Sequence, residues 1–239
     1  VVAELVHLHT AGFKTIDTPV QADAGDTGFD RTDAMLKGRW TPSDAHQLQL
    51  KLGYGREVSN ETYAGLTLSD WQADPYRRYA ATQNAQMQWD RSQVELTWQA
   101  RPSDAVQLHT VAYHHYLTRQ WTKLNGFRAG PDLHTLLGQA PDSGQAAVFL
   151  AILRGEEDSA TADQQLMIGT NDRSFHAFGV QSTARWEVNT ERVGSALEAG
   201  ARLHGDIVDR LHTEDPHEMR AGRLTDSGDA DLTNMDSRA

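Results

Sequence analysis

A hairpin pattern that recurs three times constrains the fold most strongly. Each copy contains a strand, a tryptophan, a short polar turn and a second strand, and the copies span residues 34–52, 94–111 and 180–203. The first two turns share Pro-Ser-Asp-Ala, in which proline presets φ and the Ser and Asp side chains can bond the local backbone. The repeat therefore predicts a series of antiparallel β-hairpins.

Apolar and polar residues alternate along the strands of these hairpins with a period of two. In residues 47–54, three leucines and a tyrosine occupy one face, and Gln, Lys and Gly occupy the other. The segments 93–98 and 197–207 divide in the same way. One face of the predicted sheet is therefore apolar, and the other is polar and partly charged.

Tryptophan precedes the short turn in every hairpin, at Trp40, Trp98 and Trp186. In membrane β-barrels, aromatic residues form girdles at the level of the lipid headgroups. The alternative is a soluble antiparallel sheet with one face on a core, but such a core has no reason to place tryptophan at the same end each time. The run 194–208 is also about twice the usual strand length of ~5–6 residues. We therefore predict that the three tryptophans form a membrane-interface girdle.

Composition excludes a helical membrane protein and permits a barrel. Apolar residues make up 38% of the chain, and the mean hydropathy is −0.59. The longest continuous apolar run, Ala146–Leu153, is far short of the ~20 residues that a spanning helix needs. A spanning strand needs only one apolar face over about 9–11 residues, so a barrel can have a composition that looks soluble.

The connections between strands also alternate in length. The turns after the three tryptophans are short, whereas the connections between residues 58 and 86, between 121 and 175 and after 208 are long and polar. Outer-membrane barrels have short periplasmic turns and long extracellular loops. We therefore predict an all-β fold, part of an antiparallel transmembrane β-barrel, with a short helix near 139–155 in one extracellular loop. About seven strands are expected, near residues 1–14, 32–40, 47–58, 86–100, 106–121, 175–188 and 194–208.

One residue does not follow the alternation of the strands. Trp89 has the opposite parity to Trp98, which predicts either a bulge or a position beyond the apolar band.

The ends and the composition of the chain give further expectations. The chain begins within a strand pattern at Val1 and ends in what resembles a loop, so we expect both ends to be truncated. The net charge of −11 argues against nucleic acid as a partner, and the absence of cysteine removes disulfides and thiolate chemistry.

Residues 57–84, with Asp-Trp-Gln-Ala-Asp-Pro-Tyr-Arg-Arg-Tyr near their centre, resemble a loop of TonB-dependent receptors related to the ferric dicitrate transporter. Residues 26–30, 153–159 and 169–181 resemble the same group, and the resemblance extends to about residue 207. It implies a larger barrel with an N-terminal plug inside it, so that residues 1–239 are part of the barrel domain and the plug domain is missing. It also implies import of a ferric chelate, a siderophore or iron citrate, across the bacterial outer membrane. The partners would be the outer-membrane bilayer, the ferric chelate, and the TonB complex through the missing plug region.

Four residues of that loop are candidates for substrate binding: Tyr76, Arg77, Arg78 and Tyr79. Two guanidinium groups beside two phenols could hold an anionic chelate, because the arginine fork matches carboxylates. The alternative is that these side chains pack together and bridge neighbouring loops.

A second set of candidates lies on the polar face of the predicted strands. They could line a substrate path through the lumen, or they could form an ionic lattice with each other or with a plug. These lumen-lining residues are Lys51, Glu95, Arg185, Glu198, Arg202 and His204.

No motif indicates catalysis, a metal site or a cofactor. His7 and His9 lie on one strand face, and His114 and His115 point to opposite faces, but no third ligand stands at a fixed spacing. The acidic tail, 226–236, lacks the spacing and closing Glu of a calcium loop and is expected to be a solvated loop. We therefore predict no enzyme activity. Two other interpretations stay open, a passive porin and a soluble secreted β-sandwich that binds a ligand.

Overall fold

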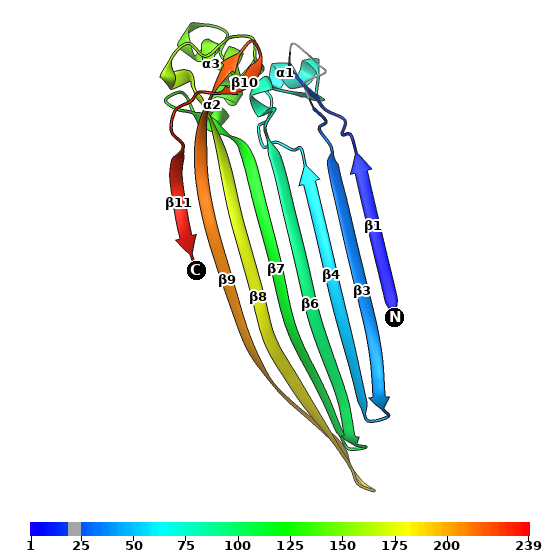
Figure 1. Ribbon diagram of the computed structural model, residues 1–239. Helices are drawn as coiled ribbons and strands as arrows, with labels where there is room; N and C mark the ends of the chain where they lie inside the picture. Colours follow the sequence, from blue (N-terminus) through cyan, green and yellow to red (C-terminus); the bar gives the residue numbers. More distant parts are fainter. Residues whose placement is uncertain (19–24) are drawn as a thin grey trace.

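The computed structural model describes residues 1–18 and 25–239 and consists of one long antiparallel sheet with a helical cap at one end (Figure 1). From β1 to β10, strands that follow one another along the chain are neighbours in this sheet, and the last strand, β11, pairs with β9. The short β2 (Thr15–Ile16) and β5 (Arg77–Arg78) lie outside it and pair with each other in the cap. The long strands are β1 (Val2–Thr10), β3 (Phe29–Ser43), β4 (His46–Ser59), β6 (Gln86–Ser103), β7 (Val106–Phe127), β8 (Leu166–Asn189) and β9 (Gly194–Arg220). The cap contains the helices α1 (Leu68–Ala73), α2 (Leu133–Gln139) and α3 (Gly144–Arg154), with single 3₁₀ turns at Ala80–Thr82 and Ala162–Gln164.

The seven predicted strands are confirmed, but β7, β8 and β9 are longer than the alternation indicated, with 22, 24 and 27 residues. Two predictions were wrong. Instead of a long connection after residue 208, β9 continues to Arg220 and turns tightly at Ala221 and Gly222, which have φ values of 48° and 76°. Instead of a terminal loop, the chain forms β10 (Arg223–Asp226) and β11 (Leu232–Arg238) along the outer edge of β9. Beyond the apolar band both faces of a strand are polar, so no alternation marks these segments.

Register assigns every strand residue to one of two faces. Leu50 of β4 is paired with Leu96 of β6, which is paired with Ala112 of β7. Directly paired residues share a face, so the apolar side chains predicted from alternation all lie on one face. They are uncovered: Leu50 is 44% exposed, Val94 45% and Leu197 66%.

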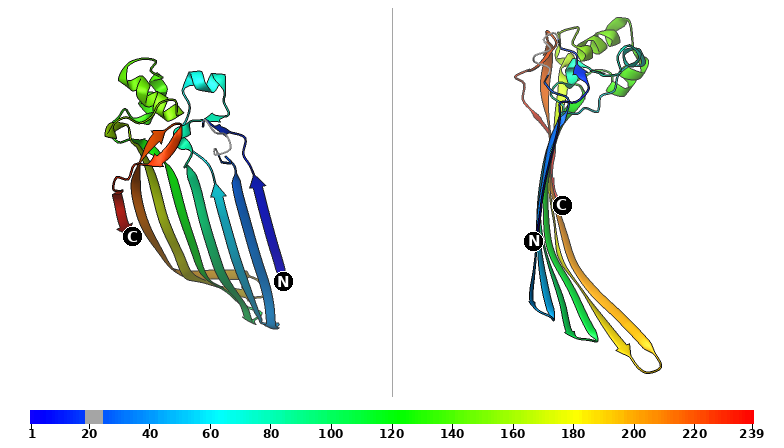
Figure 2. Two further views of the ribbon diagram at one scale, coloured as in Figure 1. Left: turned by 45° about the horizontal axis from the view of Figure 1, so that its top comes forward. Right: turned by 90° about the vertical axis from the view of Figure 1, so that its right-hand side faces the viewer.

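The sheet is curved, and the cap helices lie on its concave side (Figure 2). The polar face is the concave one, because Tyr63 from the β4–β6 connection stacks on Trp121 of that face at 4.3 Å between ring centroids. Within the described residues no second sheet covers the apolar face. These residues therefore do not form a β-sandwich by themselves, since that fold buries its apolar faces between two sheets.

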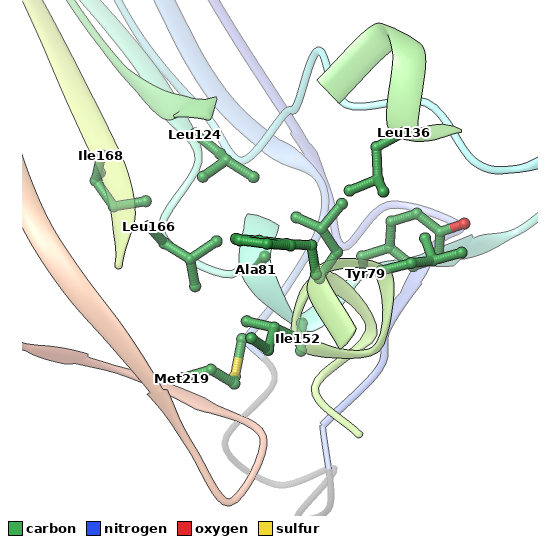
Figure 3. Packing of buried hydrophobic residues seen from close by; sticks show 12 residues of the cluster. Tyr79, Ala81, Leu124, Leu136, Ile152, Leu166, Ile168 and Met219 are labelled. Carbon is green, nitrogen blue, oxygen red and sulfur yellow. The ribbon is translucent and has the colours of Figure 1, made fainter. Parts of the chain in front are cut away.

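The cap has a hydrophobic core of its own, built from α2, α3 and the ends of β7, β8 and β9 (Figure 3). The predicted short helix is confirmed as α3, which ends at Gly155 with a φ of 81°. No helix in the described part of the chain is long and apolar enough to cross a membrane. The buried members of the core are Tyr79, Ala80, Ala81, Leu124, Leu136, Phe149, Leu150, Ile152, Leu153, Leu166, Ile168 and Met219.

Replacement of Ile152 with alanine should loosen the cap and leave the sheet intact. Ile152 is fully buried in this core, and truncation of such a side chain destabilises by about 2–5 kcal/mol. Hydrogen exchange of the α3 amides should accelerate accordingly, with unchanged exchange in β4 and β6. Val148→Ala, in the same helix but 38% exposed, is the matched control and should change exchange by less than about 1 kcal/mol. Equal effects of the two variants would contradict this account of the core.

Candidate functional site

The segment 74–79 joins two connections that are distant in the sequence. β2 and β5 pair in parallel, with Thr15 opposite Arg77 and Ile16 opposite Arg78. Backbone hydrogen bonds extend the pair at both ends, from the Thr15 amide to the Tyr76 carbonyl at 2.9 Å and from the Asp17 amide to the Arg78 carbonyl at 2.7 Å. The predicted ligand loop is therefore part of the scaffold of the cap.

Asp70 is the hub of this scaffold. It lies in the first turn of α1, whose N-cap residue is Thr67, and its carboxylate accepts hydrogen bonds from the Tyr79 hydroxyl at 2.5 Å, Arg154 Nε at 2.9 Å and an Arg77 guanidinium nitrogen at 3.1 Å. Arg77 also donates to Asp17 at 2.9 Å. Asp70 therefore links the β4–β6 and β7–β8 connections, and Arg77 extends the cluster to Asp17 in the β1–β3 connection.

The cluster shifts the acidity of its members. Burial alone opposes ionisation of Asp70, but the hydrogen bonds from Tyr79, Arg154 and Thr67 outweigh it and lower the pKa of this carboxyl. Burial raises the pKa of the Tyr79 hydroxyl, and its hydrogen bond to Asp70 adds to that effect.

Arg78 is more deeply buried than Arg77. Its side chain is only 3% exposed and donates to the backbone carbonyls of Asn60 at 2.7 Å and Thr82 at 2.8 Å. Burial lowers the pKa of its guanidinium. It therefore holds loop backbone in place from inside the cap.

The geometry thus divides the four candidate ligand residues. Arg77, Arg78 and Tyr79 bridge the loops, as the alternative interpretation describes, and a ligand in solvent cannot reach Arg78 or Tyr79 unless the cap rearranges. Tyr76 is 57% exposed and packs edge-on against Phe13 at 5.9 Å between ring centroids. Of the four, Tyr76 alone offers an open side chain, and its role in binding stays a prediction.

The six lumen-lining candidates all share the polar face. Lys51 is directly opposite Glu95, and Arg185 is directly opposite Glu198 and forms an ion pair with Glu187 at 2.9 Å. The register places these side chains together, and their role in a substrate path stays a prediction.

Arg202 and His204 belong to a polar network. The Tyr113 hydroxyl lies 2.7 Å from both an Arg202 nitrogen and His204 Nδ1, and His204 Nε2 lies 2.8 Å from Asp206. Tyr113 and His204 meet across Gly179 of the intervening strand, where an added Cβ would lie 2.7 Å from the Tyr113 hydroxyl. Asp33 and Arg91 meet across Gly55 in the same manner. Contacts of this kind could not be predicted from the sequence, because they depend on the register of three strands.

The three tryptophans of the predicted girdle lie on the apolar face near the short turns. Trp40 and Trp98 flank the same residue, Leu48, and Trp186 is paired with Val106 beside the next turn. Trp40 is 64% exposed. These positions suit a girdle, and contact with lipid stays a prediction.

A second row of aromatic side chains on the apolar face was not predicted. Register aligns Tyr54, Tyr116 and His176 on one row, and Tyr116 and His176 are 4.5 Å apart between ring centroids. This row lies six residues from the Trp98 row, or about 20 Å at the rise of an antiparallel strand. Leu50, Leu52, Val94 and Leu96 lie between the two rows, whereas Trp186 and Leu197 lie four residues beyond the Trp98 row, towards the short turns.

Trp89 occupies the polar face. The pairing of β4 with β6 is continuous from residues 46 and 100 to residues 59 and 87, so no bulge intervenes. The guanidinium carbons of Arg31 and Arg91 lie 5.5 and 5.6 Å from its ring centroid. The opposite parity of Trp89 therefore reflects a cation–π contact on the concave side.

The first two histidines singled out in the sequence contact polar side chains of the neighbouring strand β3. His7 Nδ1 lies 3.0 Å from the Thr32 hydroxyl, and His9 Nδ1 lies 2.9 Å from Asp30. His114 and His115 are on opposite faces. Among the residues that the structure describes, no group of three or more His, Cys, Asp or Glu side chains could hold a metal ion.

Comparison with known proteins gives one informative result. No protein-family profile matches the sequence, and no curated protein matches it. Among solved structures, the chain is similar to the ferric citrate transporter FecA in its unliganded form, with a TM-score of 0.52 and 15% sequence identity. The match covers 88% of this chain and 25% of that transporter, so the chain spans about a quarter of its length. At this identity the likeness shows the fold alone: the chain has the fold of a β-barrel fragment similar to that transporter.

Replacement of Asp70 with asparagine should open the cap around its buried arginines. Loss of one charged partner of a hydrogen bond is worth about 1.5–3 kcal/mol, which corresponds to a roughly ten- to hundredfold larger open population. Trypsin should therefore cleave after Arg77 and Arg78 that much faster. Asp74→Asn is the matched control, because Asp74 is exposed and its carboxylate accepts a hydrogen bond from the Tyr76 amide at 2.9 Å within the same segment. Equal cleavage rates of the two variants would contradict the role of Asp70 in holding the cap together.

The lowered pKa of the Asp70 carboxyl predicts that the stability of the cap depends on pH. Its folded pKa is lowered, so its stabilisation is complete above the unfolded pKa of about 3.9 and is lost as the pH falls through the folded pKa. Protection of the α1 amides, corrected for the intrinsic exchange rate, should stay constant from neutral pH to about 5 and decrease below about 4. The Asp70→Asn variant should lack this decrease, and an identical decrease in both proteins would argue against the assignment.

Proposed function

We propose that this chain is part of the barrel domain of a bacterial outer-membrane, TonB-dependent transporter that imports a ferric chelate, a siderophore or iron citrate. The observation that carries the proposal is the division of one curved sheet into an uncovered apolar face and a polar concave face beneath a cap. The likeness of its fold to the ferric citrate transporter supports the choice of cargo.

Lipid is the partner that suits the apolar face. Burial of apolar surface contributes about 25 cal/mol per Å², and the exposed leucines, valines and tryptophans of this face lie in one band. A sheet in lipid must leave no open edge, because unpaired backbone groups there are strongly unfavourable. β1 and the β10–β11 edge would therefore pair with further strands of a closed barrel, with the polar face towards its lumen.

The proposed mechanism uses binding and displacement. The cap would collect the chelate on the outer side, and the polar face would guide it inward. A plug, moved by force from the TonB complex, would open the path. The chain's residues hold and orient charge in this scheme, and no step requires a cofactor or an enzymatic reaction.

Uptake of radioactive iron by cells tests this proposal. The complete protein would be expressed in an outer-membrane bacterium that lacks its own receptors for ferric chelates and supplied with ferric citrate or individual siderophores. We expect saturable iron uptake from at least one chelate, abolished by a protonophore and by deletion of the TonB complex. Uptake that persists without energy would indicate a passive porin, and an absence of uptake from every chelate would contradict the proposed cargo.

A further inference from the structure

Three arginines occupy directly opposed positions on neighbouring strands of the polar face. Arg119 of β7 is paired with Arg173 of β8, which is paired with Arg210 of β9. Opposed side chains have Cβ atoms about 5 Å apart, so these residues form a compact cationic arginine row. Like charges in such positions destabilise a sheet. The row therefore requires a counter-charge, in a chain whose own net charge is −11.

Nearby carboxylates of the same face already have other partners. Asp206 bonds to His204 at 2.8 Å, and Glu214 accepts a hydrogen bond from Asn125. The ion pairs of these strands involve other arginines, such as Arg91 with Asp33 and Arg185 with Glu187. Within the described chain, no ion pair includes a member of the arginine row.

Unsatisfied donors gather at the same place. Among the described residues, the buried side-chain nitrogens and oxygens without a hydrogen-bond partner are Arg119 Nε, Arg210 Nε and Trp121 Nε1. Trp121 follows Arg119 by two residues on the same face, and the Arg119 guanidinium carbon lies 5.8 Å from its ring centroid. Arg173 Nε donates to Asn171 at 2.8 Å. Buried donors are almost always satisfied in native proteins, so three unpaired ones in a single patch indicate an absent acceptor.

The arginine row lies directly beneath the cap. Arg119 is three residues beyond Tyr116, on the side of the long connections and outside the apolar band. Above the row, Tyr63 of the cap stacks on Trp121, and Lys123 Nζ lies 4.8 Å from the centroid of the Tyr63 ring. A solute that enters from the cap therefore meets this patch first on the polar face.

We propose that the arginine row and Trp121 Nε1 bind a polyanion that carries several carboxylate or phosphate oxygens. Guanidinium forks match both oxyanions bidentately, and the indole contributes a donor with no competing acceptor. The inference rests on the proposed function in so far as it identifies an anionic chelate as the cargo. Binding of the anion itself requires no transport, so the two can fail separately.

Binding to the complete, detergent-solubilised protein tests this inference. Calorimetry and thermal unfolding would compare ferric citrate, citrate and inorganic pyrophosphate with a cationic trihydroxamate iron chelate. We expect the oxyanions to bind and raise the unfolding temperature, with affinity that falls at high salt, and the cationic chelate to leave it unchanged. Stronger binding of ferric citrate than of pyrophosphate would show that the site prefers carboxylate ligands, and the reverse would show that it prefers phosphate ligands.

Arg173→Gln should weaken oxyanion binding by roughly ten- to hundredfold and remove the ligand-induced rise in unfolding temperature. Without ligand, this variant should unfold at the native temperature or above, because it relieves repulsion within the arginine row. Arg173→Lys should bind with intermediate affinity. Arg101→Gln, an exposed position beside the short β6–β7 turn, is the control for loss of one charge and should bind normally. If Arg173→Gln does not fold, Arg119→Gln provides the same test.

Two results would overturn the inference: native oxyanion affinity in Arg173→Gln, or a lowered unfolding temperature of that variant without ligand. The second result would show that the arginine row pairs with carboxylates elsewhere in the protein. If Arg173→Gln leaves energised iron uptake intact, this inference is contradicted and the proposed function is not. If oxyanion binding depends on Arg173 but the protein imports no ferric chelate, the proposed function is contradicted and this inference is not.

Discussion

Backbone pairing across seven antiparallel strands, with register shifts only near strand ends, determines the rest of this structure. Each residue is held opposite a specific partner, so its side chain belongs permanently to one of two faces. Where the pairing holds without a shift, as between β4 and β6, apolar side chains collect on one surface and charged ones on the other. A slip of one residue would invert both surfaces. The apolar band, the polar networks and the arginine row are all consequences of this register.

The cap depends on a different kind of interaction. Its connections approach one another over a small hydrophobic core, and Asp70 joins two of them through Arg154 while Arg77 joins a third through Asp17. Charged hydrogen bonds thus add to the apolar contacts that hold these connections together. The arginines of the cap are satisfied by this hub and by backbone carbonyls, whereas those of the arginine row have no such partners. This contrast distinguishes arginines with a structural role from arginines that are free to bind a ligand.

Alternation in the sequence predicted the two faces and most of the seven strands, although residues 1–9 and 106–116 did not divide cleanly, and the apolar run 146–153 predicted the short helix α3. It failed beyond residue 208 because both faces of β9 are polar there, and strand pairing rather than burial holds the segment. The parity of Trp89 left open a bulge or a position beyond the apolar band; the register is continuous, and Trp89 lies three residues beyond the Tyr54 row, where it contacts two arginines of the polar face. Arg119, Arg173 and Arg210 lie 54 and 37 residues apart in sequence, so no local pattern could bring them together. Sequence reading also offered Arg77 and Arg78 as ligand contacts, because it could not show that Asp70, Asp17 and the loop backbone engage them.

The most direct measurement of the central claim is the environment of two adjacent residues on β6. Leu96 is 45% exposed on the apolar face, and Glu95 occupies the polar face. Spin labels on single cysteines at these positions, in the complete protein reconstituted in a bilayer, would report collisions with oxygen in lipid and with a water-soluble nickel complex. The account predicts that the label at 96 collides mainly with oxygen and the label at 95 mainly with nickel. Equal exposure of both labels to the nickel complex, or protection of both from lipid and water, would contradict it.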